Sequence, residues 1–248
     1  MKTALEHKFL AIDAGNSSLK GGVFCGLKKL AGFSQTYDRL DFLPFASEDL
    51  KGAIISSVVP SKNGAIFEAL QKLGIENPLL VDHRTKTGIK VDYNPPQTLG
   101  PDRIALAAGA YHFYTAINKT NSLVVSCGTA ITINLVETPG VFSGGAILPG
   151  PNLMLEALTK AELLQSPRFD SFAVEIGKST SASIVAGISS AIIGAINKFR
   201  EIAGMHTLIL TGGYASLLTD FMDEPFIVDT DLSLRGLSAI YIINKGWI

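Results

Sequence analysis

The feature that most constrains the fold is a short polar segment, residues 11–20, which separates two apolar runs near the start of the sequence. Residues 9–12 have the length and composition of a buried strand, and residues 19–23 predict a second strand that runs back beside it. A tight turn is therefore expected at Gly15-Asn16. Because glycine tolerates positive φ and has no Cβ, the main chain there can approach a bulky anion, with neighbouring polar side chains as donors.

Two charged side chains flank this turn. Asp13 ends the first strand and would face the bound anion, which repels it unless a divalent cation lies between them. Lys20 supplies a positive charge from the returning strand. Carboxylate, turn and lysine together point to a magnesium-bound nucleotide. The alternative is an ordinary structural hairpin, because Asp and Gly-Asn are also common turn residues.

Composition limits the class of protein and of partner. At 248 residues, with 47% hydrophobic and 17% charged residues, the sequence predicts a compact protein of one large domain or two ordinary ones. The formal net charge of -1 gives no electrostatic footprint for nucleic acid or an anionic membrane. Residues 1–8 lack the pattern of a signal peptide, and the uncharged run 179–197 reads as a buried or interface helix. Because Cys25 and Cys127 lack CxxC spacing, we expect a cytoplasmic protein with reduced thiols.

Apolar runs and helical spacings follow the same order in both halves of the sequence. Residues 1–118 predict three strands and then an alternation of helix and strand, and residues 119–248 repeat this order. We therefore expect an α/β fold of two similar domains with these boundaries, which rest on element order alone. The second half opens with its own turn at Gly128-Thr129-Ala130. Two facing sheets would bring both turns to one cleft, where they neutralise a nucleoside triphosphate together.

A second chemical motif is the segment Gly100-Pro101-Asp102-Arg103. Proline fits the first position of a helix, so these residues are expected at a helix start. Phosphoryl transfer to an alcohol needs a carboxylate near the acceptor hydroxyl and cationic groups that hold the substrate, and Asp102 and Arg103 could supply both. The alternative is structural, since Asp is favoured in a first helical turn and Asp-Arg can form a solvated ion pair.

Three further features allow either a ligand role or a structural one. The glycines of residues 144–150 and 211–213 permit close approach of a ligand, such as the flat face of an adenosine, or of another backbone segment. Thr180 is expected to be the N-cap of a helix that carries isoleucine at every fourth position. Gly187 within this helix indicates close approach of a second helix, as at a dimer interface.

Taken together, these segments resemble the type III pantothenate kinase family, whose fold is similar to that of the actin and sugar-kinase ATPase superfamily. The resemblance implies two ribonuclease-H-like domains with a nucleotide cleft between them. Each segment is common, but the ordered set covers nearly the whole chain and is specific. The matching segments are Asp13-Ala14-Gly15-Asn16-Ser17-Ser18-Leu19-Lys20, Ser56-Ser57-Val58-Val59-Pro60, Tyr93-Asn94-Pro95, Gly100-Pro101-Asp102-Arg103, Gly128-Thr129-Ala130, Gly144-Gly145 with Pro149-Gly150, Thr180, Thr211-Gly212-Gly213 and Leu234-Arg235-Gly236-Leu237.

The resemblance also implies a reaction and a set of roles. ATP plus pantothenate would give 4'-phosphopantothenate and ADP, the entry step to coenzyme A, and the acceptor comes from the resemblance alone. ATP would be bound by Thr129 and the first turn, with Asp13 holding Mg2+ indirectly. Asp102 would be the general base, and Thr180 would reach the substrate near a homodimer interface. The implied sets are, for ATP, Asp13, Ala14, Gly15, Asn16, Ser17, Ser18, Leu19, Lys20 and Thr129, and, for pantothenate, Tyr93, Gly100, Pro101, Asp102, Arg103 and Thr180.

Two positions depart from the family pattern, which usually has Asp where this chain has Ser126 and Asn134. The first of those carboxylates is linked to a monovalent cation such as potassium or ammonium. Ser126 offers an oxygen but no negative charge, so a potassium requirement is an open question. The departures favour a rival interpretation, a non-catalytic regulator resembling the Bvg accessory factor proteins, whereas Asp13 and Asp102 argue for catalysis. A kinase for a different small alcohol is the third alternative.

Overall fold

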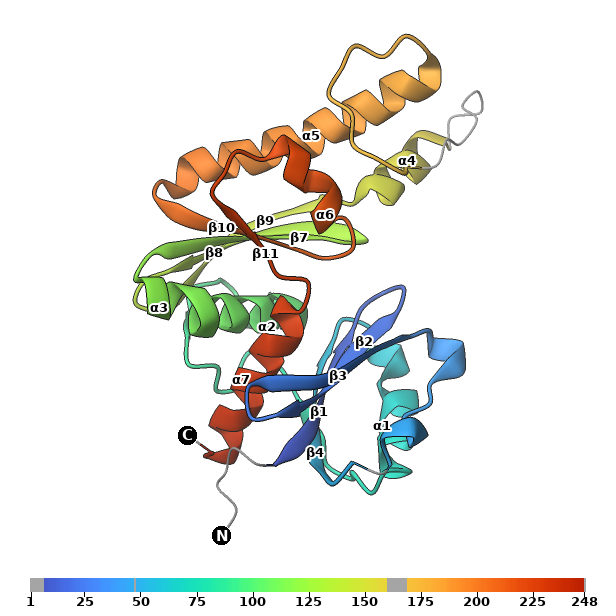
Figure 1. The fold of residues 1–248 in the computed structure, drawn as a ribbon, viewed down its shortest axis with the longest axis vertical. Coiled ribbons are helices and arrows are strands. Elements are labelled where there is room, and N and C mark those ends of the chain that lie inside the picture. The colour runs from blue at the N-terminus through green and yellow to red at the C-terminus, as the bar shows by residue number, and fades with distance from the viewer. Residues whose placement is uncertain (1–6, 47, 160–168, 248) are drawn as a thin grey trace.

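The computed structural model describes residues 7–46, 48–159 and 169–247. Residues 1–6, on which much of the signal-peptide expectation rests, lie outside this part of the chain. Figure 1 shows two sheets, one above the other, with the helices α2 (Pro101–Ala110) and α7 (Leu232–Lys245) between them. This arrangement confirms the predicted α/β class, and it sets the ends of strands from both sheets beside one gap.

The first sheet has the order β3-β2-β1-β4-β5. Its central strand β1 pairs antiparallel with β2 and parallel with β4. Consecutive residues are buried along β1 and along the second half of β4, so both faces of these central strands are covered, as in an α/β sheet. Its elements are β1 (Lys8–Ala14), β2 (Leu19–Cys25), β3 (Lys28–Gln35), β4 (Leu50–Ser57), α1 (Asn63–Gln71) and β5 (Leu79–Leu80).

The second sheet repeats this plan. Strand β7 pairs antiparallel with β8 and parallel with β10, as β1 does with β2 and β4. The sheet order is β11-β10-β7-β8-β9-β6, and β6 is a two-residue strand from the first half of the chain that pairs with β9. The strands are β6 (Lys90–Val91), β7 (Asn121–Cys127), β8 (Ala130–Glu137), β9 (Val141–Pro149), β10 (His206–Thr211) and β11 (Phe226–Val228).

Helices cover the second sheet and fill the space between the two sheets. Helix α5 packs its isoleucines on one face of the second sheet, where Ile188, Ile192 and Ile196 belong to its apolar core. By length and composition α5 is the one helix in the described ranges that could span a membrane, and its buried isoleucines lie in the core of the second sheet. The remaining helices are α3 (Ala116–Asn118), α4 (Pro151–Thr159), α5 (Thr180–Ala203) and α6 (Ala215–Leu218).

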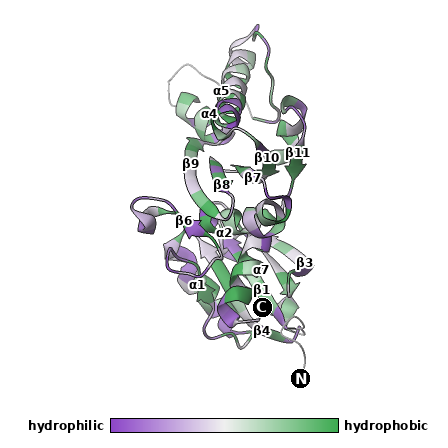
Figure 2. Ribbon diagram, turned by 90° about the vertical axis from the view of Figure 1, so that its left-hand side faces the viewer, coloured by the Kyte–Doolittle hydropathy of each residue, from purple (hydrophilic) through white to green (hydrophobic). Residues whose placement is uncertain are grey.

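Helix α7 completes the core of the first sheet although it comes from the second half of the chain. The rings of Phe9 and Tyr241 stack with centroids 4.3 Å apart, and Ile240 is fully buried in the same core. Figure 2 shows the hydrophobic colour along β1 and α7, which contact each other. The division at residue 118 stays a prediction. Helix α7 lies in the second half of the sequence, but it packs on the first sheet, whose strands come from the first half.

Helices α2 and α7 cross at two glycines. A Cβ at Gly236 would lie 1.8 Å from the carbonyl oxygen of Ala105, and a Cβ at Gly109 would lie 2.4 Å from that of Leu232. Side chains at these positions would therefore force the two backbones apart. The crossing fixes the first turns of α7 against the middle and the end of α2.

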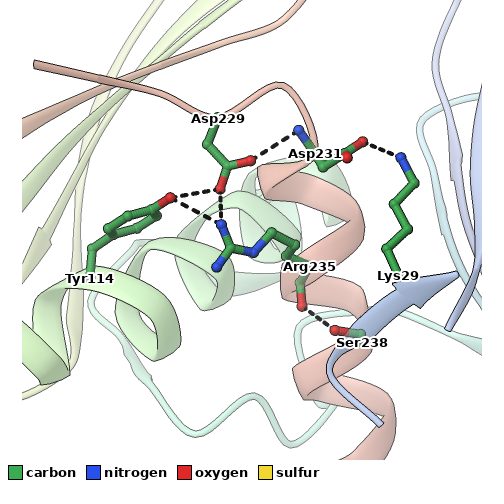
Figure 3. Close-up of polar contacts among 6 residues, drawn as sticks. All are labelled: Lys29, Tyr114, Asp229, Asp231, Arg235 and Ser238. Carbon is green, nitrogen blue, oxygen red and sulfur yellow. Dashed lines mark hydrogen bonds and ion pairs between the residues drawn. The ribbon is translucent and has the colours of Figure 1, made fainter. Parts of the chain in front are cut away.

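A polar cluster holds α7 against both sheets (Figure 3). Arg235 and the hydroxyl of Tyr114 donate to the buried carboxylate of Asp229, at 2.5 and 2.9 Å. Beside it, Lys29 of β3 donates to Asp231 at 2.6 Å. The stem of Lys29 lies across the first sheet, where Gly32 leaves room for it. Charge pairing thus fixes the start of α7 relative to β3 and β11.

Candidate nucleotide and acceptor site

The first predicted turn lies between β1 and β2, as expected. Asp13 pairs with Lys20 across the two strands, and the turn is closed by a hydrogen bond from Gly15 N–H to the Ser18 carbonyl at 3.1 Å. The hydroxyl of Tyr37 donates to the carbonyl of Gly15 at 2.5 Å. The turn is therefore held from both sides while its outer polar atoms remain available.

The second predicted turn lies between β7 and β8. Its Gly128 N–H donates to the Ala130 carbonyl at 3.1 Å, and the Gly150 N–H donates to the Thr129 carbonyl at 2.9 Å. A Cβ at Gly150 would lie 2.4 Å from that Thr129 oxygen. The glycine-rich stretch 144–150 thus serves close approach of backbone, one of the two roles the sequence allowed.

The two turns meet across one cavity of about 250 Å³. The hydroxyl oxygens of Ser17 and Thr129 are 3.2 Å apart, which joins the turns directly. The positive φ expected at the first turn is wrong, because Gly15 is not among the described glycines with positive φ, and neither is Gly128. What these two residues contribute is the missing side chain. The lining comprises Asp13, Gly15, Asn16, Ser17, Ser18, Lys20, Val58, Asp102, Leu106, Ser126, Gly128, Thr129, Ala130, Thr132, Thr211, Gly212, Gly213, Thr230, Ser233 and Leu234.

Asp13 is the carboxylate at the base of this cavity. Burial raises its pKa above the ordinary value, and the nearby Asp102 carboxylate raises it further. The hydroxyls of Ser233 and Ser56 and the charge of Lys20 lower the pKa without outweighing burial. A cation bound beside Asp13 would favour its charged form, so the group is suited to a site that fills with a metal-bound anion.

Asp102 comes from the first turn of α2, at the position the sequence predicted. Burial raises its pKa, and the backbone N–H and positive charge of Arg103 oppose that shift. A Cβ at Gly100 would lie 2.5 Å from the Asp102 carboxylate, so glycine leaves space for this side chain. Asp102 therefore lies in the first turn of α2 and also lines the cavity. A structural role at the helix start does not exclude a chemical role in the cavity.

Arg103 and Tyr93 lie together beside the second sheet. Arg103 is 4% exposed, and its Nη1 donates to the Tyr93 hydroxyl at 3.3 Å while its Nε donates to Asn134 Oδ1 at 2.6 Å. Its charge also lies over the rings of Tyr93 and Phe142. Arg103 and Tyr93 are thus neighbours, whereas of the predicted acceptor residues only Asp102 is among those that line the cavity.

Thr180 does not join the cavity within one chain. It lines a separate groove of about 960 Å³ between α4 and α5. The prediction that it caps α5 is wrong: Ser179 is the N-cap, and its hydroxyl accepts from Ala182 N–H at 3.2 Å. A Cβ at Gly187 would meet nothing within 4 Å, so no second helix from the described part of the chain packs closely against it.

The opposite wall of the cavity mixes predicted and unpredicted residues. Gly212 has φ of +89°, and a Cβ there would lie 2.4 Å from the Cys127 carbonyl, so this glycine is required by backbone packing. Thr230 and Ser233, which the sequence reasoning missed, line the same wall. Ser233 directly precedes the Leu234-Arg235-Gly236-Leu237 segment. Its place next to a segment that carries the family resemblance is the one feature of the sequence that could have indicated it.

The donor set fits Mg2+ bound together with phosphates. Among the residues that the structure describes, no three His, Cys, Asp or Glu side chains gather as a metal cage. Mg2+ at nucleotide sites needs only one or two carboxylates, with water and phosphate oxygens as its other ligands. Asp13 and Asp102 line the cavity that both turns share. At the position where the resemblance implies a carboxylate linked to a monovalent cation, Ser126 offers a neutral hydroxyl and no charge.

Solved structures of similar shape define the class. A hexokinase of the ROK class from Thermus thermophilus superposes with a TM-score of 0.50 at 13% identity, covering 96% of this chain and 99% of that one. A Baf family transcriptional activator from Campylobacter jejuni gives a TM-score of 0.62 at 22% identity, covering 96% and 100%. With its two repeated sheets and a cleft between them, the chain has the ATPase fold of sugar kinases and actin-like proteins.

Sequence comparison then gives the family. The model for type III pantothenate kinase matches residues 9–201. The type III pantothenate kinase of Thermus thermophilus is 33% identical over 252 residues, covering 94% of this chain and 98% of the relative. The relative from Listeria innocua is 34% identical over 261 residues, covering 95% and 97%. The chain belongs to the type III pantothenate kinase family.

Proposed function

We propose that this protein transfers the γ-phosphoryl group of ATP to pantothenate, giving 4'-phosphopantothenate and ADP. Family membership supports both the enzyme class and the acceptor. One observation supports the proposal at the level of individual residues. The two turns meet at one cavity, and Asp102 lines that cavity. Each part that phosphoryl transfer requires then has a named candidate in this chain.

The nucleotide would lie along the two turns. Backbone N–H groups and hydroxyls at Ser17 and Thr129 would bind the phosphates, and Lys20 would add a positive charge at the cavity edge. The bare backbone at Gly212 and Gly213 would accommodate the adenosine side. The remaining residues of the first turn, 14–19, complete this proposed set.

Asp102 is the proposed general base. Its carboxylate would take the proton of the pantothenate hydroxyl while that oxygen forms its bond to the γ-phosphorus and the bond to the β-phosphate oxygen breaks. ADP leaves with that oxygen, so charge and atoms balance. Positioning and charge neutralisation would supply most of the rate, and the base about 10²-fold or more. Tyr93, Gly100, Pro101 and Arg103 would hold the acceptor beside it.

Asp13 would hold Mg2+ through water at the phosphates. When bound, Mg2+ neutralises charge on the transferred group. Holding this ion beside the Ser17 turn leaves Asp102 free to accept a proton. Because Ser126 offers a hydroxyl where the family usually has a carboxylate, we propose catalysis that needs no potassium or ammonium.

We further propose a cytoplasmic homodimer. The groove between α4 and α5 is apolar, and Leu153 and Leu158 beside it are 39% and 42% exposed. A second copy packed there would cover these side chains and bring Thr180 of the partner subunit toward an acceptor site. Gly187, with open space around it, would permit the close helix contact that the sequence suggested.

The test is an ADP-release assay with and without pantothenate, repeated in sodium, potassium and ammonium. We expect ADP release that depends on pantothenate and that is similar in the three salts. ATP binding without pantothenate-dependent turnover would favour the regulator instead, and turnover with another small alcohol would replace the acceptor. A strong requirement for potassium would contradict the role assigned to Ser126.

A further inference from the structure

A tyrosine outside the cavity holds the first turn by a main-chain carbonyl. Tyr37 opens a short 3-10 helix, Tyr37–Arg39, that follows β3. Its hydroxyl donates to the carbonyl oxygen of Gly15 at 2.5 Å, across 22 positions of the sequence. Gly15 lines the cavity, whereas Tyr37 is not among the lining residues. The Gly15 carbonyl is therefore directed out of the cavity, toward the tyrosine.

The ring of Tyr37 is fixed by its surroundings. It packs against the apolar core of the first sheet. The ammonium nitrogen of Lys62 lies 5.8 Å from the ring centre, a distance at which a cation and an aromatic face attract each other. Burial and the charge of Asp13 raise the pKa of the Tyr37 hydroxyl, so it stays protonated and acts as the donor. The hydroxyl thus meets Gly15 from a well-supported position.

The peptide group that Tyr37 holds carries a second polar group, the N–H of Asn16. The peptide between Gly15 and Asn16 is trans, so its C=O and its N–H point in opposite directions. With the carbonyl directed out of the cavity, the N–H is directed toward it. Asn16 itself lines the cavity, and its N–H donates to no acceptor in the described part of the chain. This main-chain donor is therefore available to a ligand.

We infer that Tyr37 is a positioning residue for the nucleotide: it holds the Gly15 carbonyl away from the cavity and so directs the Asn16 N–H at the phosphate groups. Without this hydrogen bond, the peptide would be free to turn its carbonyl oxygen toward the phosphates, which that oxygen repels. Backbone N–H groups form an anion site only while their peptides keep one orientation. This inference rests on the proposed function, because it requires that phosphates bind at the first turn.

The test is Tyr37→Phe, which removes the hydroxyl and keeps the ring. We expect the KM for ATP to rise about three- to tenfold, the usual effect of losing one such hydrogen bond. The kcat and the KM for pantothenate should change less than about twofold, because the lost contact holds the nucleotide in the ground state and in the transition state alike. Calorimetric binding of ATP to the full chain should weaken in parallel. A role in stability alone would lower the Tm without separating the two KM values.

Two further variants separate the hydroxyl from other effects. Tyr241→Phe is the matched control, since it deletes a hydroxyl that donates to the Lys51 carbonyl at 3.5 Å, away from the residues that line the cavity. Both KM values should stay unchanged in this variant. Tyr37→Leu removes the ring and its contact with Lys62 as well as the hydroxyl. Its KM for ATP should match that of Tyr37→Phe, because the hydroxyl carries the effect.

The outcomes separate this inference from the proposed function. If the wild type binds ATP but shows no turnover dependent on pantothenate, the proposed function fails, and calorimetry of the same variants still tests Tyr37. If Tyr37→Phe binds ATP as tightly as the wild type, the positioning role is overturned. An equal rise of both KM values would overturn it as well, because the effect would then not be specific to the nucleotide. A far larger loss in Tyr37→Leu than in Tyr37→Phe would assign the effect to the ring and have the same consequence.

Discussion

At the scale of single residues, the site combines two carboxylates whose burial opposes their charge. Asp13 and Asp102 come from different elements, β1 and α2, and each has its pKa raised chiefly by burial. In the proposed reaction both would act in the charged form, Asp13 beside a cation and Asp102 as the base. The residues are thus arranged for ligands rather than for the stability of the empty protein.

Asp102→Asn removes the proposed base while keeping its size. We expect kcat to fall by at least about 100-fold with ATP affinity retained, because the base contributes to proton transfer and not to nucleotide binding. In the wild type, the raised pKa of Asp102 should move the acid limb of kcat/KM above the ordinary aspartate value of 3.8. Turnover is measured against pH, and ATP binding by calorimetry. A nearly active variant would refute the assignment.

Asp13→Asn should raise stability while it abolishes turnover. The pKa of Asp13 is higher in the folded than in the unfolded chain, so its ionisation destabilises the fold as pH rises from about 3.9 through the folded value. The variant has no such cost. Its Tm should exceed that of the wild type by about 2 °C or more at pH 8 and converge with it in acid.

Thermal unfolding from pH 4 to 8, without nucleotide or Mg2+, measures this difference. Asp220→Asn, at an exposed carboxylate far from the cavity, is the control and should show no such trend. A variant that is less stable than the wild type at pH 8 would contradict the burial argument.

Sequence alone predicted most of the polar site because each turn carries its residues together. Residues 13–20 lie in one local hairpin, so their spacing already implied their proximity. Asn134 was noticed only as a departure, and its contact with Arg103 joins residues 31 positions apart. Ser233 was missed because hydroxyls in a helix start have no local signature of a ligand. The spacing of residues in the sequence does not predict contacts that depend on the tertiary fold.

At the scale of elements, the strand order was predictable and the helix placement was not. Short apolar runs predicted three strands at the start of each half, and the antiparallel pairing of β1 with β2 and β3 and of β7 with β8 and β9 confirms them. Two-residue β6 is too short to produce a pattern. Nothing in the periodicity of α7 says which sheet it covers, because an apolar face fits either one.

The crossing of α2 and α7 gives a prediction for one glycine. Gly236→Ala places a Cβ 1.8 Å from the Ala105 oxygen, so it should destabilise the protein by about 1–3 kcal/mol. Gly194→Ala is the matched control, since that glycine lies in α5 with open space around it. Alanine there should stabilise by up to about 1 kcal/mol through helix propensity. Urea unfolding measures both, and equal effects would show that the crossing is not tight.

At the scale of the whole molecule, the cleft belongs to one chain and Thr180 does not reach it. The groove that Thr180 lines is apolar and lies on the second sheet's outer helices. The resemblance implies that Thr180 reaches the substrate, but within one chain Thr180 does not line the cavity. A dimer would resolve this difference, because Thr180 of the partner subunit could reach the substrate. Oligomeric state could not be predicted from element order, which describes only the single chain.

Subunit mixing tests this arrangement. Asp102→Asn and Thr180→Ala should each be impaired alone, but a mixed dimer would contain one site with both residues intact. An equal mixture, exchanged by co-expression, should recover about a quarter of wild-type activity. Light scattering would confirm the dimer mass. If the mixture shows only the average of the two variants, Thr180 does not act across an interface.

The position of α7 has a consequence for synthesis. Ile240 and Tyr241 pack on the apolar face of the first sheet, and they leave the ribosome more than 200 residues after β1. Until then, this core has the side chains of α2 but lacks those of α7, although chains usually fold their N-terminal part first. The growing polypeptide should therefore be a substrate for holding chaperones over nearly its whole translation, and loss of its last helix should leave an insoluble product.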